Sequence, residues 1–135
     1  MKSKILNLTF IIWALVYVST SCNPLANPGK DLYVKHCQNC HGYNGEGLQH
    51  LIPPLANADF IKNNQAILAC IIKYGTSQKM RVNGVWYEEK MPSNIFLTDV
   101  EITNLINFIN TNFGNSIPKQ NLKQVVLSLE NCKKE

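Results

Sequence analysis

The sequence has little net charge and no long apolar run. Only 16% of its 135 residues are charged, and the formal net charge is +4. That balance is too even to indicate binding to nucleic acid. The longest apolar stretch, residues 5–18, is interrupted by two polar residues and is shorter than the roughly 20 residues that a membrane-spanning helix needs. The sequence therefore argues against a nucleic-acid partner and against a retained transmembrane anchor.

Histidines and alternating strand patterns are also scarce. There are three histidines, and one Cys-x-x-Cys pair, Cys37 and Cys40. A structural zinc site needs four ligands, usually from two such pairs, and His36 and His50 are not accompanied by a second pair. A thioredoxin-like redox pair belongs in a strand-helix-strand context, and no such alternation is present. We therefore expect Cys37 and Cys40 to serve neither a zinc site nor a thioredoxin-like redox reaction.

The N-terminus has the order of an export signal. Lys2 and Lys4 precede the apolar stretch, and small residues follow it up to Cys22. We predict a cleaved signal peptide over 1–21, which lowers the net charge from +4 to +2. The small residue before Cys22 resembles the lipobox of bacterial lipoproteins, which implies lipidation of Cys22; an ordinary secretory cleavage is the alternative. Residues 22–28 would then be a short tether to the domain.

Cys37, Cys40 and His41 form a Cys-x-x-Cys-His sequence, the signature of c-type haem attachment. Residues three apart in a helix share one face, so both thiols can reach the two vinyl groups of one haem. The next imidazole, His41, can then bind the iron as the proximal ligand. We therefore predict one covalent haem c.

The iron needs a sixth ligand or an open site, and four side chains are candidates. Met91 precedes Pro92, which holds the chain extended as a ligand-bearing loop requires. Met80 lies between Lys79 and Arg81 and is expected on the surface. His36 shares the attachment side of the ring, and His50 follows a glycine-rich loop. We favour Met91.

These residues resemble the small monohaem class I cytochromes c, from about Gly29 to Gly114. The resemblance implies an all-α fold, with three to four helices around one haem and crossed terminal helices. It also implies that the Pro53 carbonyl accepts the other N–H of His41 and that Met91 is the distal ligand. Gly29 and Tyr33 match the first helix of the family; the last helix is matched by Leu105 and Phe108. The glycine allows the two backbones to approach closely.

Residue spacing alone predicts the same helices. Residues 28–41 and about 65–74 have helical patterns, and Thr98 and Glu101 form a capping box before a third helix that ends at Gly114. Val125, Leu127 and Leu129 suggest a fourth helix, and Asn83-Gly84 suggests a hairpin. The predicted organisation is a haem domain over 29–115 and a C-terminal extension over 116–135.

Three further expectations concern cysteines, the haem surroundings and surface charge. We favour free thiols at Cys70 and Cys132 over a disulfide between them. The basic residues near Met91 are interpreted as a solvated face, with a docking ring as the alternative. The side chains expected around the haem are apolar: Ile52, Leu55, Leu68, Ile72, Ile95 and Leu105. The basic residues are Lys73, Lys79, Arg81 and Lys90.

A haem closed by His41 and Met91 has no open site for a substrate, so we expect a one-electron carrier and not an enzyme. A lipid at Cys22 would place it on the periplasmic face of a bacterial membrane. The expected partners are a quinol-oxidising complex as donor and a terminal oxidase or reductase as acceptor. Alternatives are an accessory subunit of a larger membrane oxidoreductase, or a haem sensor or enzyme with an open distal site and His50 as its acid/base group.

Overall fold

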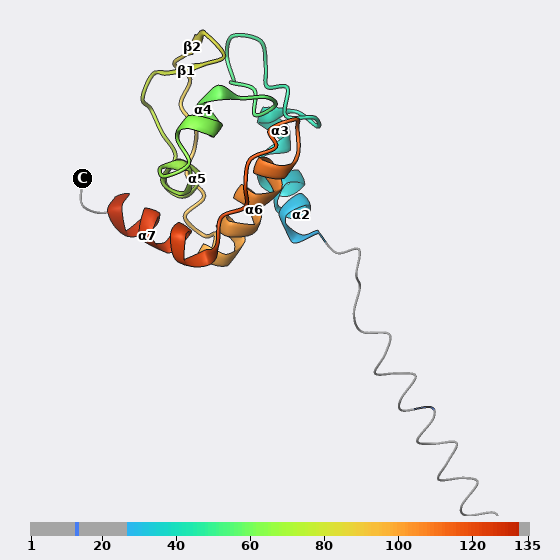
Figure 1. Cartoon of the computed structure of the whole chain (residues 1–135). Coiled ribbons are helices and arrows are strands. Elements are labelled where there is room, and N and C mark those ends of the chain that lie inside the picture. Colours follow the sequence, from blue (N-terminus) through green and yellow to red (C-terminus); the bar gives the residue numbers. More distant parts are fainter. Residues whose placement is uncertain (1–12, 14–26, 133–135) are drawn as a thin grey trace, which may run out of the picture.

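The computed structural model describes Trp13 and residues 27–132, in which short helices pack together and one small hairpin lies at the edge (Figure 1). The predicted all-α fold is confirmed, with the hairpin as its only sheet in this part of the chain. The elements of residues 27–132 are α2 Pro28–His36, α3 Gln38–His41, α4 Asp59–Asn63, α5 Leu68–Tyr74, β1 Met80–Val82, β2 Val85–Tyr87, α6 Asp99–Thr111 and α7 Leu122–Cys132.

The predicted helix over 28–41 is two helices with a break at Cys37. The side chain of Asn27 accepts the N–H of Lys30, and Pro28 occupies the first turn, where its missing N–H costs nothing. At Cys37 the backbone leaves the helical region, with φ −123° and ψ −36°. Its N–H still bonds to the Tyr33 carbonyl at 2.9 Å, so α3 starts afresh directly after α2.

Helices α2 and α6 cross at Gly29, as the resemblance implied. A Cβ atom on Gly29 would lie 2.3 Å from the Asn104 carbonyl oxygen and 2.7 Å from the Cβ of Phe108. Both distances are shorter than non-bonded contact, so only glycine fits. The two ends of the domain therefore meet by direct backbone approach.

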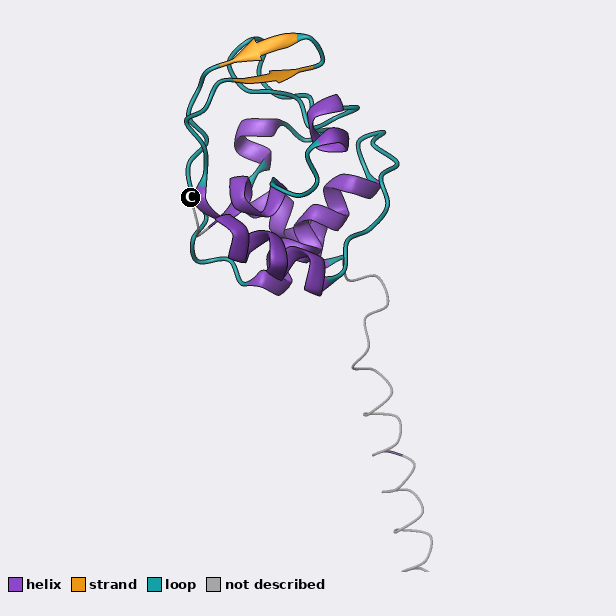
Figure 2. Ribbon diagram, turned by 60° about the vertical axis from the view of Figure 1, so that its left-hand side comes forward, coloured by secondary structure: helices purple, strands orange, loops and turns teal. Residues whose placement is uncertain are grey.

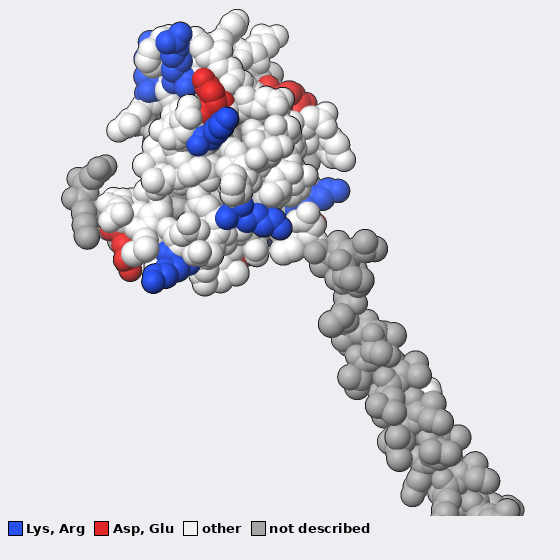
Figure 3. All heavy atoms as spheres, in the orientation of Figure 1, with Lys and Arg blue, Asp and Glu red and all other residues white. Residues whose placement is uncertain are grey.

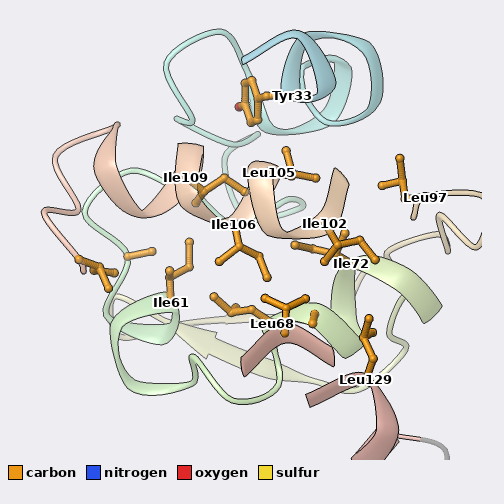
Figure 4. Packing of buried hydrophobic residues seen from close by; sticks show 14 of the residues in the cluster. Tyr33, Ile61, Leu68, Ile72, Leu97, Ile102, Leu105, Ile106, Ile109 and Leu129 are labelled. Carbon is orange, nitrogen blue, oxygen red and sulfur yellow. The ribbon is translucent and has the colours of Figure 1, made fainter. Parts of the chain in front are cut away.

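Helix α6 lies at the centre of the core. The predicted capping box is present: the Glu101 N–H donates to the Thr98 hydroxyl, and the Glu101 carboxylate accepts the Thr98 N–H. Figure 4 shows Leu105 of α6 facing Tyr33 of α2, and Ile106 facing Leu68 of α5. Helix α6 thus lies between α2 and α5.

The predicted helix over 65–74 begins three residues late, as α5 at Leu68. Gln65 is used instead in hydrogen bonds to the Ile61 carbonyl and the Asn110 side chain. Helix α4, with five residues, was not predicted because it is too short to show a helical period.

The predicted hairpin forms at Asn83-Gly84. Both turn residues have positive φ, 50° and 84°, as a tight turn between twisted strands requires. Strand β1 pairs antiparallel with β2, and Met80 is opposite Tyr87. Figure 2 shows this hairpin at one end of the molecule, beyond the helices.

The suggested tail helix is present as α7, but one expectation about this region is wrong. Its buried residues are Val125, Ser128 and Leu129, whereas Leu127 is exposed. Cys70 of α5 and Cys132 of α7 form a disulfide, which corrects the prediction of two free thiols. The sequence suggested free thiols because it gave no distance between them; packing of α7 on α5 brings the two Cα atoms to 5.8 Å.

Candidate functional site

An apolar pocket opens between α3, α5, α6 and the segment that includes the hairpin and Met91. Its walls contain Cys37, Cys40, His41, Met80 and Met91. Most of its remaining lining is aliphatic or aromatic, from segments that are far apart in sequence: Leu51, Ile52, Pro53, Pro54, Leu55, Ala58, Phe60, Ile61, Leu68, Ile71, Ile72, Val82, Tyr87, Pro92, Ile106 and Ile109. A flat apolar ring with one reactive edge fits these walls better than a polar ligand does.

Cys37, the N-cap of α3, and Cys40, within that helix, both line the pocket. Neither thiol is in a disulfide, although Cys70 and Cys132 are joined. Burial raises the pKa of Cys37 to about 11, and the neighbouring Cys40 adds to the shift. Both sulfurs are therefore free to form bonds to a group within the pocket.

His41 is buried at the end of α3 and lines the same pocket. Its Nδ1 lies 3.1 Å from the Pro53 carbonyl oxygen. That oxygen can only accept, so Nδ1 carries the hydrogen and Nε2 keeps a lone pair. Burial lowers the pKa of His41, although the bond to Pro53 opposes the shift. The ring is thus held neutral and in one tautomer, which is the form that binds a metal.

The loop after His41 returns Pro53 to the imidazole. The Gly47 N–H donates to the His41 carbonyl at 2.8 Å, and Gly47 has φ +71°. A Cβ atom there would lie 2.4 Å from the Ile52 carbonyl oxygen, so the two passes of the loop touch at a glycine. Tyr33 supports the same loop, since its hydroxyl donates to the Gly42 carbonyl at 2.6 Å.

Met91 is half-buried and lines the pocket. Its backbone pairs with Thr76 in both directions: the N–H of Met91 bonds to the Thr76 carbonyl at 2.9 Å, and the Thr76 N–H bonds to the Met91 carbonyl at 3.0 Å. This bridge ties the chain before Pro92 to the end of α5. The position of Met91 is therefore fixed by hydrogen bonds from both its N–H and its carbonyl group.

Met80 also lines the pocket, which corrects its expected place on the surface. It lies on β1 and faces inward with Val82, whereas the intervening Arg81 is exposed. The neighbouring charges suggested a surface position, but in a strand alternate residues point to opposite faces. That alternation in Met80-Arg81-Val82 was the signal that sequence reasoning missed.

The two candidate histidines lie elsewhere. His50 is exposed and is not part of the pocket wall. The ring of His36 packs against Phe96, with 5.1 Å between centroids, and it too is outside the wall. The candidates that the pocket holds for a sixth ligand are thus two methionines.

Four of the six side chains expected around the haem line the pocket: Ile52, Leu55, Leu68 and Ile72. Ile95 and Leu105 do not. Ile95 is 68% exposed, and Leu105 is fully buried against α2 instead. Leu105 and Ile106 are neighbours on a helix, so they face different sides of α6, and it is Ile106 that lines the pocket.

The basic residues near Met91 are mostly engaged within the protein. Lys73 pairs with Asp99 at 2.9 Å, and Lys79 pairs with Glu88. Arg81 donates to the Gly84 carbonyl at 3.1 Å. On the face seen in Figure 3, basic side chains are spread out with acidic ones among them. Three of the four basic residues thus contact neighbouring groups of the protein, and the fourth, Lys90, lines the pocket.

Two findings concern metal ions and membranes. Within the described part of the chain, no three Cys, His, Asp or Glu side chains gather where they could hold a metal ion, so it contains no zinc-type cluster. Among these same residues, none of the helices has the length and apolar character needed to cross a bilayer. The predicted signal peptide and Cys22 lie outside the described residues, apart from Trp13.

Comparison with known proteins gives one family match. The family model described as cytochrome c matches residues 26–113. The expected fold and cofactor class, drawn from the resemblance, agree with this match.

Curated relatives are of two kinds. The cytochrome c subunit of a quinone alcohol dehydrogenase from Gluconacetobacter polyoxogenes is 34% identical over 100 residues, which cover 73% of this chain and 21% of that protein. Cytochrome c-552 of Thermus thermophilus is 32% identical over 92 residues, which cover 65% of this chain and 70% of the relative. The chain thus spans about a fifth of the dehydrogenase subunit and most of the cytochrome c-552.

Proposed function

Because this chain belongs to the cytochrome c family, it carries a covalent haem c and transfers electrons, and we propose that it does so as a closed carrier whose iron is held by His41 and Met91. The haem supplies one-electron exchange between ferrous and ferric iron. The observation that carries the proposal is the meeting of Cys37, Cys40, His41 and Met91 in one apolar pocket.

In this proposal Cys37 and Cys40 form the two thioether bonds. Both are unpaired, and Cys37, the N-cap of α3, is three residues before Cys40 of that helix, so both thiols can face the same pocket. His41 binds through Nε2, since Nδ1 donates to the Pro53 carbonyl. That hydrogen bond keeps the imidazole in the required tautomer and raises its basicity.

Met91 is preferred to Met80 because of how its backbone is held. Met91 is fixed to Thr76 by two hydrogen bonds and precedes Pro92. Met80 lies in the hairpin wall opposite Tyr87, which is buried, and is better placed to fill the pocket. A neutral thioether favours ferrous iron, so the proposed ligand set and the apolar walls both raise the midpoint potential.

The test is the visible and near-infrared spectrum of the oxidised holoprotein. A weak near-infrared band reports methionine sulfur bound to ferric iron, and we expect it in the wild type and in Met80→Ala. It should vanish in Met91→Ala. A band that survives Met91→Ala and is lost in Met80→Ala would assign the ligand to the hairpin instead. Binding of carbon monoxide to the native reduced protein would contradict a closed site.

We also propose that the protein works at the periplasmic face of a membrane, with signal peptide 1–21 removed and a lipid on Cys22. Residues 22–28 are then the tether to a haem domain over 29–115, followed by the extension over 116–135. The support is the sequence pattern around Cys22. Metabolic labelling with a radioactive fatty acid should mark the wild type and leave Cys22→Ala unlabelled. Label on both proteins would contradict lipidation at Cys22.

The proposed partners are a quinol-oxidising donor and a terminal oxidase or reductase acceptor in a respiratory chain. A second candidate role is favoured by the relatives named as cytochrome c subunits of quinone alcohol dehydrogenases: this chain would then be an accessory haem subunit of a larger membrane oxidoreductase. Co-purification from solubilised membranes separates the two. A stoichiometric complex supports the subunit role, whereas recovery of the cytochrome alone supports a shuttle.

A further inference from the structure

The side chain of Asn115 joins the end of α6 to the loop that carries Pro53. Its Oδ1 accepts the Ala58 N–H at 3.1 Å, and its Nδ2 donates to the carbonyls of Leu55 at 2.8 Å and Ile109 at 2.9 Å. Both amide hydrogens are therefore used. Asn115 lies two residues beyond the region matched by the family model.

The loop segment that Asn115 holds is stiffly coupled to Pro53. Pro54 stands between Pro53 and Leu55, and its ring fixes φ, which removes one rotation from that short path. The N–H groups of Leu55 and Ala56 both donate to the Gly45 carbonyl, at 2.8 and 2.9 Å. A displacement of the Leu55 carbonyl therefore moves the Pro53 carbonyl with it.

We propose that Asn115 is a positioning residue for the axial imidazole. It holds the loop so that the Pro53 oxygen stays 3.1 Å from Nδ1 of His41. Asn115 is not part of the pocket wall, so it reaches His41 only through this loop. The inference rests on the proposed function, in which His41 is the proximal ligand.

Loss of the Asn115 contacts should shift the redox equilibrium in one direction. A carbonyl that accepts from Nδ1 makes the imidazole a stronger electron donor, and a stronger donor stabilises ferric iron. If the loop relaxes and this bond lengthens, ferrous iron is favoured. We expect an equilibrium shift of about threefold toward the ferrous form, which is about 28 mV for a one-electron couple.

The experiment compares Asn115→Ala with the control Asn112→Ala in the holoprotein. Asn112 lies in the same stretch, but its Nδ2 donates only to the Phe108 carbonyl and the Thr111 hydroxyl. Two quantities are measured: the midpoint potential, and the solvent exchange of the His41 Nδ1 hydrogen by NMR in the ferrous state. Asn115→Ala should raise the potential and speed this exchange about tenfold, while the control leaves both unchanged.

Asn115→Asp carries the same test if the alanine variant does not accumulate, because a carboxylate keeps the size but cannot donate to Leu55. The inference is overturned if the variant lowers stability yet leaves potential and exchange at the control values; Asn115 then only stabilises the fold. Failure of the proposed function would be recognised by a different result: the His41 ring of the wild type would show no haem-shifted resonances.

Discussion

Removing the Cys70–Cys132 disulfide should lower the free energy of unfolding by about 3 kcal/mol. The bond closes a loop between residues 62 apart in sequence. The chain-entropy relation gives about 14 cal/mol/K for a loop of that size, or about 4 kcal/mol at 25 °C. Measured effects usually fall below this limit, hence the lower figure.

The variant should still fold, because α7 has an apolar face of its own. Val125 and Leu129 are almost fully buried, and burial of one such side chain contributes about 1.5–3 kcal/mol. Ser128 adds a hydrogen bond to the Ala66 carbonyl. The expected product is therefore a native-like protein whose midpoint of thermal unfolding falls by roughly 15 °C.

The assay is guanidinium unfolding of the Cys70→Ser/Cys132→Ser holoprotein, followed by circular dichroism. Wild-type protein treated with a reductant is the matched control and should show the same loss. Thiol titration of the unfolded wild type should find neither Cys70 nor Cys132 free. An unfolding free energy within about 0.5 kcal/mol of the wild type would refute the loop-entropy reasoning, and two titratable thiols at these positions would refute the bond itself.

Three further predictions concern the helix ends. Gly29→Ala places a Cβ atom 2.3 Å from the Asn104 carbonyl oxygen, so the α2–α6 crossing must open and the free energy of unfolding should fall by about 2 kcal/mol. Thermal unfolding measures this loss. A change no larger than that caused by the exposed control Lys30→Ala would contradict the tight crossing. Thr98→Ala removes the acceptor for the Glu101 N–H and should cost about 1 kcal/mol in denaturant unfolding, whereas an unchanged midpoint would mean that the cap adds nothing. Hydrogen bonds from Thr98 lower the pKa of Glu101 below its ordinary 4.5, so its stabilisation is full above that pH and is lost as the pH falls through the folded-state pKa. Glu101→Gln should flatten this acid limb, and an identical pH profile would argue against the carboxylate.

Patterns confined to neighbouring residues predicted most of the helices and the hairpin. The capping box marks α6 because Thr98 and Glu101 satisfy each other within one turn. Asn83-Gly84 marks the hairpin because few residue pairs tolerate positive φ at both positions. Local chemistry decides both features, so a single sequence reveals them.

The errors concern contacts between distant segments. The disulfide depends on how α7 packs on α5, which no spacing reveals. Met80 was placed on the surface because of its charged neighbours, and Leu105 was placed around the haem because it is apolar. Neither property says which face of an element meets the pocket. Nothing in the sequence distinguishes Asn115, because an asparagine near a helix end is common and its three hydrogen-bond partners are known only from the structure.

The crossing at Gly29 also sets an order of events during synthesis. The segment around Gly29 is made first, but the surface it packs against, at Asn104 and Phe108, emerges some 75 residues later. Until then helix α2 has no partner to pack against, and the short helices are not stable alone. The α2–α6 crossing therefore cannot close until the last third of the domain is present.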